Sequence, residues 1–221
     1  MSNLEIELQA LKENLLEMME LVSGQITLCK DATLNGNLEL ASEVVSNENR
    51  VNALELTMDK DCENILALHN PVATDLRFVL AVLKNTGDLE RIGDNAKNIA
   101  TFLTKNGKKL DKIYLDKFGI EKMYDASISM LSCLGKALKK DDAELARKTF
   151  KEEELLNKKN KNGPKIAAAL IEEDPKQAKL IVRLLSVVNK LERVGDLAIN
   201  IAEEVVFHVE AKVLKHNKDK S

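Results

Sequence analysis

The sequence of 221 residues contains no Trp, and Phe, Tyr and Trp together make up only 3% of it. Because proteins that hold single-stranded nucleic acid stack its bases on aromatic side chains, this scarcity argues against that class of protein. An excess of positive charge is also missing, since 33 basic side chains face 36 acidic ones. A nucleic-acid-binding protein needs a basic surface, so we expect no direct nucleic-acid partner.

Cysteine is equally scarce, because Cys29, Cys62 and Cys133 are the only three and form no Cys-x-x-Cys motif. Their number and spacing argue against a disulfide framework or a zinc ribbon and are typical of reduced thiols in a cytosolic protein. The sequence has neither the apolar run of roughly 20 residues that crosses a membrane nor the apolar segment of a signal peptide. We therefore expect a cytoplasmic protein without membrane insertion, which can still dock on a membrane protein.

Apolar residues, chiefly Leu, Ile, Val, Ala and Met, make up most of the hydrophobic 44% of the chain. Ala and straight-chain residues lose little conformational freedom in a helix, so the composition predicts an all-α fold. Breaking signals at Asn35-Gly36-Asn37, Asn70-Pro71 and Asn106-Gly107 divide the first half of the chain. The segments between such signals predict six long helices, at about residues 4–34, 38–69, 72–106, 110–139, 142–173 and 175–215.

Proline marks two places in the second half. Gly163-Pro164 is expected to kink or split the fifth helix, because Pro removes a helical hydrogen bond. Asp174-Pro175 is typical of the N-cap and first position of a helix, here the sixth. Residues 217–221 are polar, and we expect them to form a disordered tail.

The two halves of the chain repeat one another. Residues 88–100 read DLERIGDNAKNIA and residues 190–202 read KLERVGDLAINIA, so nine of thirteen positions are identical at an offset of 102 residues. Each half then holds three helices, which would pack most simply as an antiparallel bundle. We predict one three-helix repeat over residues 1–108 and a second over residues 109–216. The same pattern also fits a single array of six helices.

Each copy of this motif places two acidic side chains one helical turn apart. Glu90 and Asp94 form the first pair, and Glu192 and Asp196 form the second. At about 100° per residue the pairs lie roughly 140° and 120° from the centres of the apolar stripes, on the flank or outer face of each bundle. The stripes predict the core positions, which are Leu89, Ile92, Ala96, Ile99 and Leu103 in the third helix and Leu184, Val187, Val188, Leu191, Val194, Ala198, Ala202, Val205 and Val209 in the sixth.

Carboxylates on one helix face repel each other, and a bound cation would compensate this repulsion. Oxygen ligands suit Mg, Ca, Mn or Fe, although such a pair is also common on a merely solvated surface. If a metal binds, further ligands are expected among polar residues of the same or adjacent helices, namely Glu48, Asn52, Asn98, Glu153, Asn157, Asn200 and Glu203. Gly93 and Gly195 lie between the acids, and because a mid-helix Gly costs about 1 kcal/mol relative to Ala, they indicate close approach of a neighbouring helix or ligand.

No catalytic motif accompanies these carboxylates. The sequence holds no Glu-x-x-His element, no phosphate-binding P-loop and no Gly-x-Ser-x-Gly nucleophile elbow. We therefore expect a non-catalytic protein. The alternative is a metal-dependent enzyme or a metal-storage bundle, in which the same carboxylates would form a two-metal site.

Residues 70–83, NPVATDLRFVLAVL, followed by DLERIGD at 88–94, resemble the PhoU family. LERVGD at 191–196 and NIAE at 200–203 are similar to the second repeat of that family, so the resemblance covers nearly the whole chain. Two features depart from the family pattern. Asn95 and Leu197 stand where a His often follows the motif Asp, and the second repeat has no counterpart of Asp75-Leu76-Arg77. The first departure leaves the identity of a bound metal open.

This resemblance implies two three-helix bundles related by pseudo-twofold symmetry. It further implies a cytoplasmic negative regulator of phosphate uptake and phosphate-starvation signalling, which acts with the ATPase subunit of the phosphate ABC transporter and with a membrane sensor histidine kinase. The motifs would bind iron or another divalent cation, and no reaction would be catalysed. We also expect a homodimer, because helical faces remain exposed. The alternative within this reading is an accessory protein of a phosphate transporter outside the ABC class.

Overall fold

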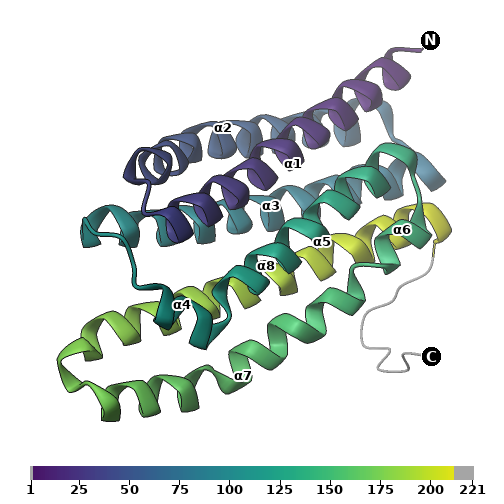
Figure 1. Ribbon diagram of the computed structural model, residues 1–221. Coiled ribbons are helices and arrows are strands. Elements are labelled where there is room, and N and C mark those ends of the chain that lie inside the picture. The colour runs from purple at the N-terminus through teal and green to yellow at the C-terminus, as the bar shows by residue number, and fades with distance from the viewer. Residues whose placement is uncertain (1, 212–221) are drawn as a thin grey trace.

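The computed structural model describes residues 2–211, which form eight α-helices and one short 3-10 helix (Figure 1). None of these residues lies in a strand, so the predicted all-α class is confirmed. The end of the predicted sixth helix and the predicted tail lie outside the described residues. The elements are α1 (Asn3–Asn35), α2 (Leu38–His69), α3 (Ala73–Asn106), α4 (Lys112–Phe118), α5 (Ile120–Lys140), α6 (Ala143–Arg147), α7 (Phe150–Glu173), η1 (Pro175–Gln177) and α8 (Ala178–Glu210).

The first three helices begin and end close to the predicted positions. The side chain of Ser2 accepts a hydrogen bond from the backbone of Glu5 at the start of α1, which satisfies one of the free amide groups of the helix end. Gly36, Asn70 and Gly107 follow the three helices and take left-handed backbone conformations, with φ of 73°, 46° and 64°. Gly and Asn tolerate that conformation best, which is why the turn signals in the sequence located these ends correctly.

The second half is more interrupted than predicted, so the count of six helices is only approximate. The fourth predicted helix is broken at Gly119, whose φ of 70° ends α4 and starts α5. The fifth is broken before Phe150, which separates the five residues of α6 from α7. By contrast, α7 continues through Pro164 without a break, because this proline lies on the exposed face, where a helix can bend without opening the core. Asp174 and Pro175 do open the last long segment, although its first turn is the 3-10 helix η1.

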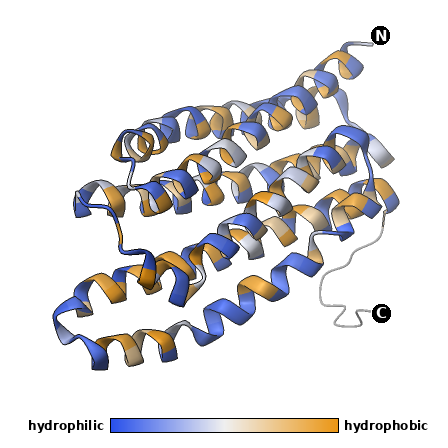
Figure 2. Cartoon of the chain, viewed as in Figure 1, coloured by the Kyte–Doolittle hydropathy of each residue, from blue (hydrophilic) through white to orange (hydrophobic). Residues whose placement is uncertain are grey.

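The two central helices, α3 and α8, pack against each other in opposite directions. Lys84 of α3 pairs with Glu204 of α8 at 2.9 Å, and Arg77 of α3 donates to the backbone oxygen of His208. On one side α1 and α2 pack against α3, and on the other α5, α6 and α7 pack against α8 (Figure 1). The apolar faces of the helices turn inward (Figure 2) and form one core that runs through both halves.

The predicted apolar stripes are buried with one exception. Val209, the last residue of the second stripe, is 37% exposed. It lies in the final turn of α8, where few neighbouring helices remain to cover it. The other thirteen stripe residues are at most 3% exposed, so the periodicity located the core faces of α3 and α8 correctly.

Polar contacts also join the two halves. The hydroxyl of Tyr124 on α5 lies 2.9 Å from Thr33 Oγ1 and 3.3 Å from Cys29 Sγ, both on α1, and all three side chains are buried. Burial raises the pKa of Cys29 to about 12, so its thiol stays protonated and unreactive. All three cysteines are free, as predicted.

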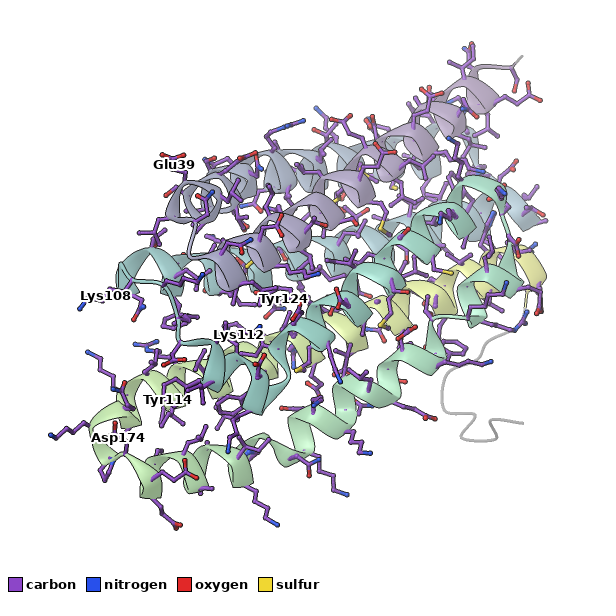
Figure 3. All side chains as sticks on the ribbon, in the orientation of Figure 1. Glu39, Lys108, Lys112, Tyr114, Tyr124 and Asp174 are labelled. Carbon is purple, nitrogen blue, oxygen red and sulfur yellow. The ribbon has the colours of Figure 1, made fainter. Side chains whose placement is uncertain are left out.

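The outward surface is dominated by polar and charged side chains (Figure 3). Within residues 2–211 no helix combines the length and the apolar character needed to cross a membrane.

The mid-helix glycine of the second motif gives a test of this packing. A Cβ atom at Gly195 would collide with the side chain of Leu156, which is fully buried on α7. We expect Gly195→Val to lower the free energy of unfolding by about 1–3 kcal/mol through overpacking, measured by urea denaturation. At Gly24 a Cβ atom would meet no other atom within 4 Å, so the matched Gly24→Val variant should stay within about 0.5 kcal/mol of the natural protein. Equal losses in both variants would show that Gly195 is not a site of close helix contact.

Candidate metal centre

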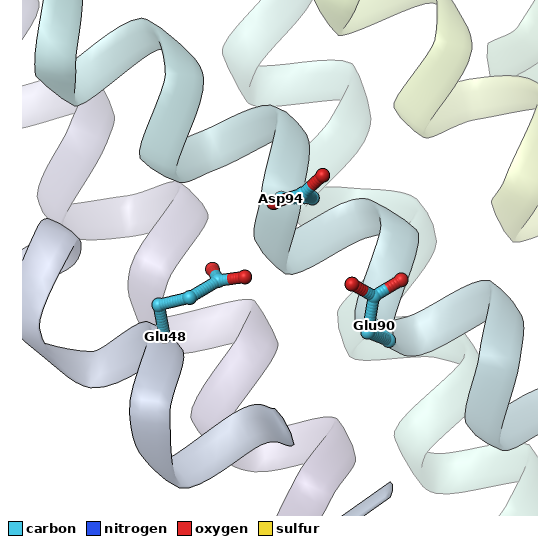
Figure 4. A group of neighbouring side chains, drawn as sticks. All are labelled: Glu48, Glu90 and Asp94. Atoms are coloured by element: carbon cyan, nitrogen blue, oxygen red, sulfur yellow. The ribbon is translucent and has the colours of Figure 1, made fainter.

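Three carboxylates from two helices converge in the first half of the chain (Figure 4). Glu48 extends from α2, and Glu90 and Asp94 lie one turn apart on α3. One oxygen atom from each of the three lies within 4.8 Å of the other two. Two ligands on opposite sides of a Ca²⁺ ion lie about 4.6–5.2 Å apart and neighbouring ligands lie closer, so the three oxygens are near enough to share one ion.

The close packing of α2 on α3 brings Glu48 to this place. A Cβ atom at Gly93 would lie 3.1 Å from Gln25 Oε1 and 3.4 Å from Val51 Cγ1, so a larger residue would push α1 and α2 away. Gly93 therefore serves the close helix approach that the sequence indicated. Glu48 lies between the buried residues Val44 and Val51 on the inner face of α2 and is only 3% exposed.

Burial and neighbouring negative charge disfavour the ionised forms of Glu48 and Glu90. The pKa of Glu48 is raised, chiefly by burial and further by the nearby Asp94, although Lys97 opposes the shift. Burial also raises the pKa of Glu90, and the charges of Glu55 and Asp94 add to the effect. A carboxyl group with a raised pKa is one whose charge is poorly compensated, so a cation at this place would relieve the repulsion.

One cation is already present in the form of Lys97. Its Nζ lies 3.4 Å from Glu48 Oε1 and 3.5 Å from Asp94 Oδ1. Burial lowers the pKa of Lys97, but the two carboxylates outweigh burial and raise it overall. Lys97 therefore stabilises part of the negative charge of the cluster, and an entering metal ion would have to displace its ammonium group.

The cluster also has buried oxygen atoms without a partner. Glu48 Oε2, Asn52 Oδ1 and Gln25 Oε1 have no hydrogen-bond donor among the described residues. Asn52 follows Glu48 by one turn on α2, so its amide oxygen lies on the same face of that helix. Leaving a buried acceptor unpaired costs about 1–3 kcal/mol, and a metal ion or the water bound to it would satisfy such atoms. The residues present thus fit a hard cation with oxygen ligands, without His or Cys.

The second motif is arranged more loosely. Partial burial, followed by the charges of Glu192 and Glu153, raises the pKa of Asp196 from 3.8 to about 6, although the residue as a whole is exposed. Glu153 on α7 therefore lies close enough to α8 for its charge to act on Asp196. Within residues 2–211, however, only the first set meets as a tight group of three possible metal ligands.

The remaining predicted ligands differ in their exposure to solvent. Asn98, Asn157 and Asn200 are exposed, and Glu203 is half-buried on α8. Three residues that contribute to the electrostatics of these helices were not anticipated, namely Glu55, Lys97 and Glu204. Two of them could have been predicted from their spacing in the sequence. Lys97 follows Asp94 by three residues, so both lie on one face of α3. Glu55 follows Glu48 by seven residues, so both lie on one face of α2.

In comparison with known proteins, both halves of the chain match the same domain family. Residues 15–103 and 120–205 each match the PhoU domain. The chain is 30% identical over 208 residues to a "phosphate-specific transport system accessory protein PhoU homolog" of Deinococcus radiodurans, covering 93% of this chain and 96% of that protein. It is 29% identical over 218 residues to a homolog of the same description from a Burkholderia species, covering 97% and 92% of the two chains.

Solved structures agree with this match. The crystal structure of PhoU from Pseudomonas aeruginosa superposes with a TM-score of 0.87 at 27% identity, covering 94% of this chain and 99% of that one. The phosphate transport system regulatory protein PhoU from Streptococcus pneumoniae shares the fold, with a TM-score of 0.80 at 23% identity over 96% and 99% of the chains.

The raised pKa of Asp196 predicts a pH-dependent stability. Because the folded state holds the proton more tightly than the unfolded state, the stability of the metal-free protein should fall as pH rises through the interval from about 4 to about 6. Asp196→Asn removes the ionised form, so it should raise the stability at pH 8 and leave it nearly unchanged at pH 4. Since the residue is exposed, solvent screening limits the gain to about 0.5 kcal/mol.

The measurement is the melting temperature at both pH values in the presence of EDTA. Asp116→Asn, on the exposed face of α4, is the matched control and should show no such pH-dependent gain. A gain of Asp196→Asn that is equal at pH 4 and pH 8 would contradict the electrostatic origin.

Proposed function

The chain belongs to the PhoU family, and from this membership we propose that it is a cytoplasmic negative regulator of phosphate uptake and phosphate-starvation signalling. Its relatives are named accessory proteins of a phosphate-specific transport system, which assigns it to the regulatory rather than the catalytic proteins. In this proposal it is an adaptor whose state is set by metal binding at the cluster of Glu48, Glu90 and Asp94.

The proposed partners are the ATPase subunit of the phosphate ABC transporter and a membrane sensor histidine kinase. The names of the relatives support the first, since they refer to a transport system to which the accessory protein belongs. We further propose that the chain acts as a homodimer and that residues 1–108 and 109–216 are its two repeating units. Co-purification from the native host separates this proposal from the alternative of an accessory protein for a phosphate transporter outside the ABC class.

The observation that carries the metal proposal is the set of converging, incompletely paired oxygen atoms around Gly93. Glu48 and Glu90 have raised pKa values, and Glu48 Oε2 and Asn52 Oδ1 are buried without a hydrogen-bond donor among the described residues. Such a site favours hard cations such as Mg, Ca, Mn or iron. We propose Glu192, Asp196 and Glu153 as a weaker counterpart, because their carboxylates face one another less closely and no tight group of three forms there within residues 2–211.

Regulation of phosphate uptake is tested by deleting the gene in its native host. In phosphate-rich medium the deletion should raise the expression of phosphate-starvation genes, because a negative regulator is lost. The natural gene on a plasmid should restore repression, and Glu90→Gln/Asp94→Asn should restore it only partly if metal sets the state of the adaptor. Unchanged expression in the deletion strain would refute the regulatory role.

Metal binding is tested by calorimetric titration of the metal-free protein with Mn²⁺ and Ca²⁺. We expect Glu90→Gln/Asp94→Asn to weaken binding about tenfold or more, because two ligand charges are removed. Lys97→Gln should instead strengthen binding, since the ammonium group that competes for Glu48 and Asp94 is gone. Binding should also weaken as pH falls, because the acids with raised pKa values must lose their protons to bind a metal.

The matched control for these titrations is Glu172→Gln/Asp116→Asn, which removes two exposed carboxylates elsewhere on the surface. It should bind metal like the natural protein. Equal affinity in the control and the Glu90→Gln/Asp94→Asn variant would place any bound metal outside this cluster.

A further inference from the structure

A groove of about 700 Å³ lies between the C-terminal end of α3 and the segment formed by η1 and the first half of α8. Figure 1 shows these two ends at the same side of the molecule, beside α4. None of the three carboxylates of the metal cluster lines this groove. Its lining residues are Asn98, Ile99, Thr101, Phe102, Lys105, Asn106, Lys176, Gln177, Lys179, Leu180, Arg183, Ser186, Val187 and Lys190.

Positive charge is concentrated in this lining. Five of the fourteen residues are Lys or Arg, and none is Asp or Glu. The five also take no part in the salt bridges formed among residues 2–211. The chain as a whole carries a net charge of −3, so an uncompensated group of five cations is a local exception. Cations that line one groove repel each other, and an anion bound between them would relieve this repulsion.

The cations form a row rather than a single point. Lys179, Arg183 and Lys190 lie four and eleven residues apart, which places them within about 40° of one another on one face of α8. The distance along the helix from Lys176 to Lys190 is about 20 Å at roughly 1.5 Å per residue. A row of this length matches several anionic groups in sequence, whereas a single phosphate ion would contact only one or two of the cations.

The wall provided by α3 has a different character. Phe102 and Ile99 give it an apolar part, and Asn98, Thr101 and Asn106 offer neutral hydrogen-bonding groups. Leu180 and Val187 of α8 continue the apolar surface between the cations. The volume falls within the range of about 300–1,000 Å³ that is usual for small-molecule sites.

We propose that this groove binds a small molecule that carries a chain of two or more phosphate groups. Lys and Arg hold phosphate oxygens by charge-assisted hydrogen bonds, and their spacing along α8 allows successive phosphates to be held by successive cations. Such a ligand is either a nucleoside triphosphate, whose base would lie against Phe102, or an inorganic oligophosphate, which would not use the apolar wall. The site is independent of the metal cluster and goes beyond the regulatory role proposed above.

Calorimetric titration of the full-length, metal-free protein at about 0.15 M salt, where exposed charges are largely screened, tests the proposal. The probes are ATP, tripolyphosphate and orthophosphate, each in EDTA. We expect ATP or tripolyphosphate to bind, and Lys179→Ala/Arg183→Ala to weaken that binding about tenfold or more. Both side chains are exposed and Ala favours helices, so the variant should keep its fold, which circular dichroism verifies.

Matched variants exclude a general effect of charge and identify the ligand. Lys158→Ala/Lys161→Ala removes two exposed cations of α7 outside the groove and should bind the probes like the natural protein. If Phe102→Ala weakens ATP binding and leaves tripolyphosphate binding unchanged, the ligand is a nucleotide. If it changes neither, the groove recognises the phosphate chain alone.

Three results would overturn the proposal. The first is that neither ATP nor tripolyphosphate binds, and the second is that orthophosphate binds as tightly as tripolyphosphate. The third is equal affinity in the natural protein and the Lys179→Ala/Arg183→Ala variant. The variant Glu90→Gln/Asp94→Asn must retain phosphate-chain binding, because a loss there would assign the ligand to the metal cluster. Failure of the metal titration or of the gene deletion leaves these outcomes unaffected.

Discussion

The close antiparallel packing of α3 against α8 is the contact on which the rest of the molecule depends. Both helices present a nearly continuous stripe of small and branched apolar residues, and these stripes are buried in one core that both halves share. Since burial of apolar area is the main source of stability, this seam fixes the rotation of each helix about its own axis. Every other side chain of the two repeated motifs is placed by that rotation.

The acidic groups lie on the flanks as a result. With one face of α3 committed to the core, Glu90 and Asp94 turn toward α2, and Gly93 lets α2 come close enough for Glu48 to join them. The corresponding flank of α8 faces α7, whose Leu156 fills the space beside Gly195. The two repeats therefore share their motif, but within residues 2–211 a tight group of three carboxylates forms only on the flank of α3.

The sequence predicted those features that depend on local chemistry and helical period. The all-α class, the ends of the first three helices and thirteen of the fourteen stripe residues follow from turn residues and from a period of 3.6. The breaks at Gly119 and before Phe150 could not be read in the same way, because a single Gly or a short polar stretch is compatible with both a helix and a turn. The tertiary contacts of each segment decide between the two.

In the candidate site, too, the spacing within one helix was predictable and the contacts between helices were not. Spacing within one helix was enough to pair Glu90 with Asp94, and the repeat was enough to suggest Glu48 as a partner from α2. Nothing in the sequence could rank Glu48 above Asn98 or Asn200, because the burial of a side chain depends on which helix covers it. The role of Lys97 was hidden for the same reason, since its partner Glu48 lies 49 positions away in the chain.

Lys97 also affects how a metal ion would bind to this cluster. Its ammonium group already neutralises one charge between Glu48 and Asp94, so an incoming ion would be exchanged for it rather than added to an empty space. In net charge, a potassium or sodium ion would gain nothing from such an exchange, because one unit of charge would replace another. Only an ion of higher valence would increase the attraction, so the lysine would set a minimum charge for an ion that binds here.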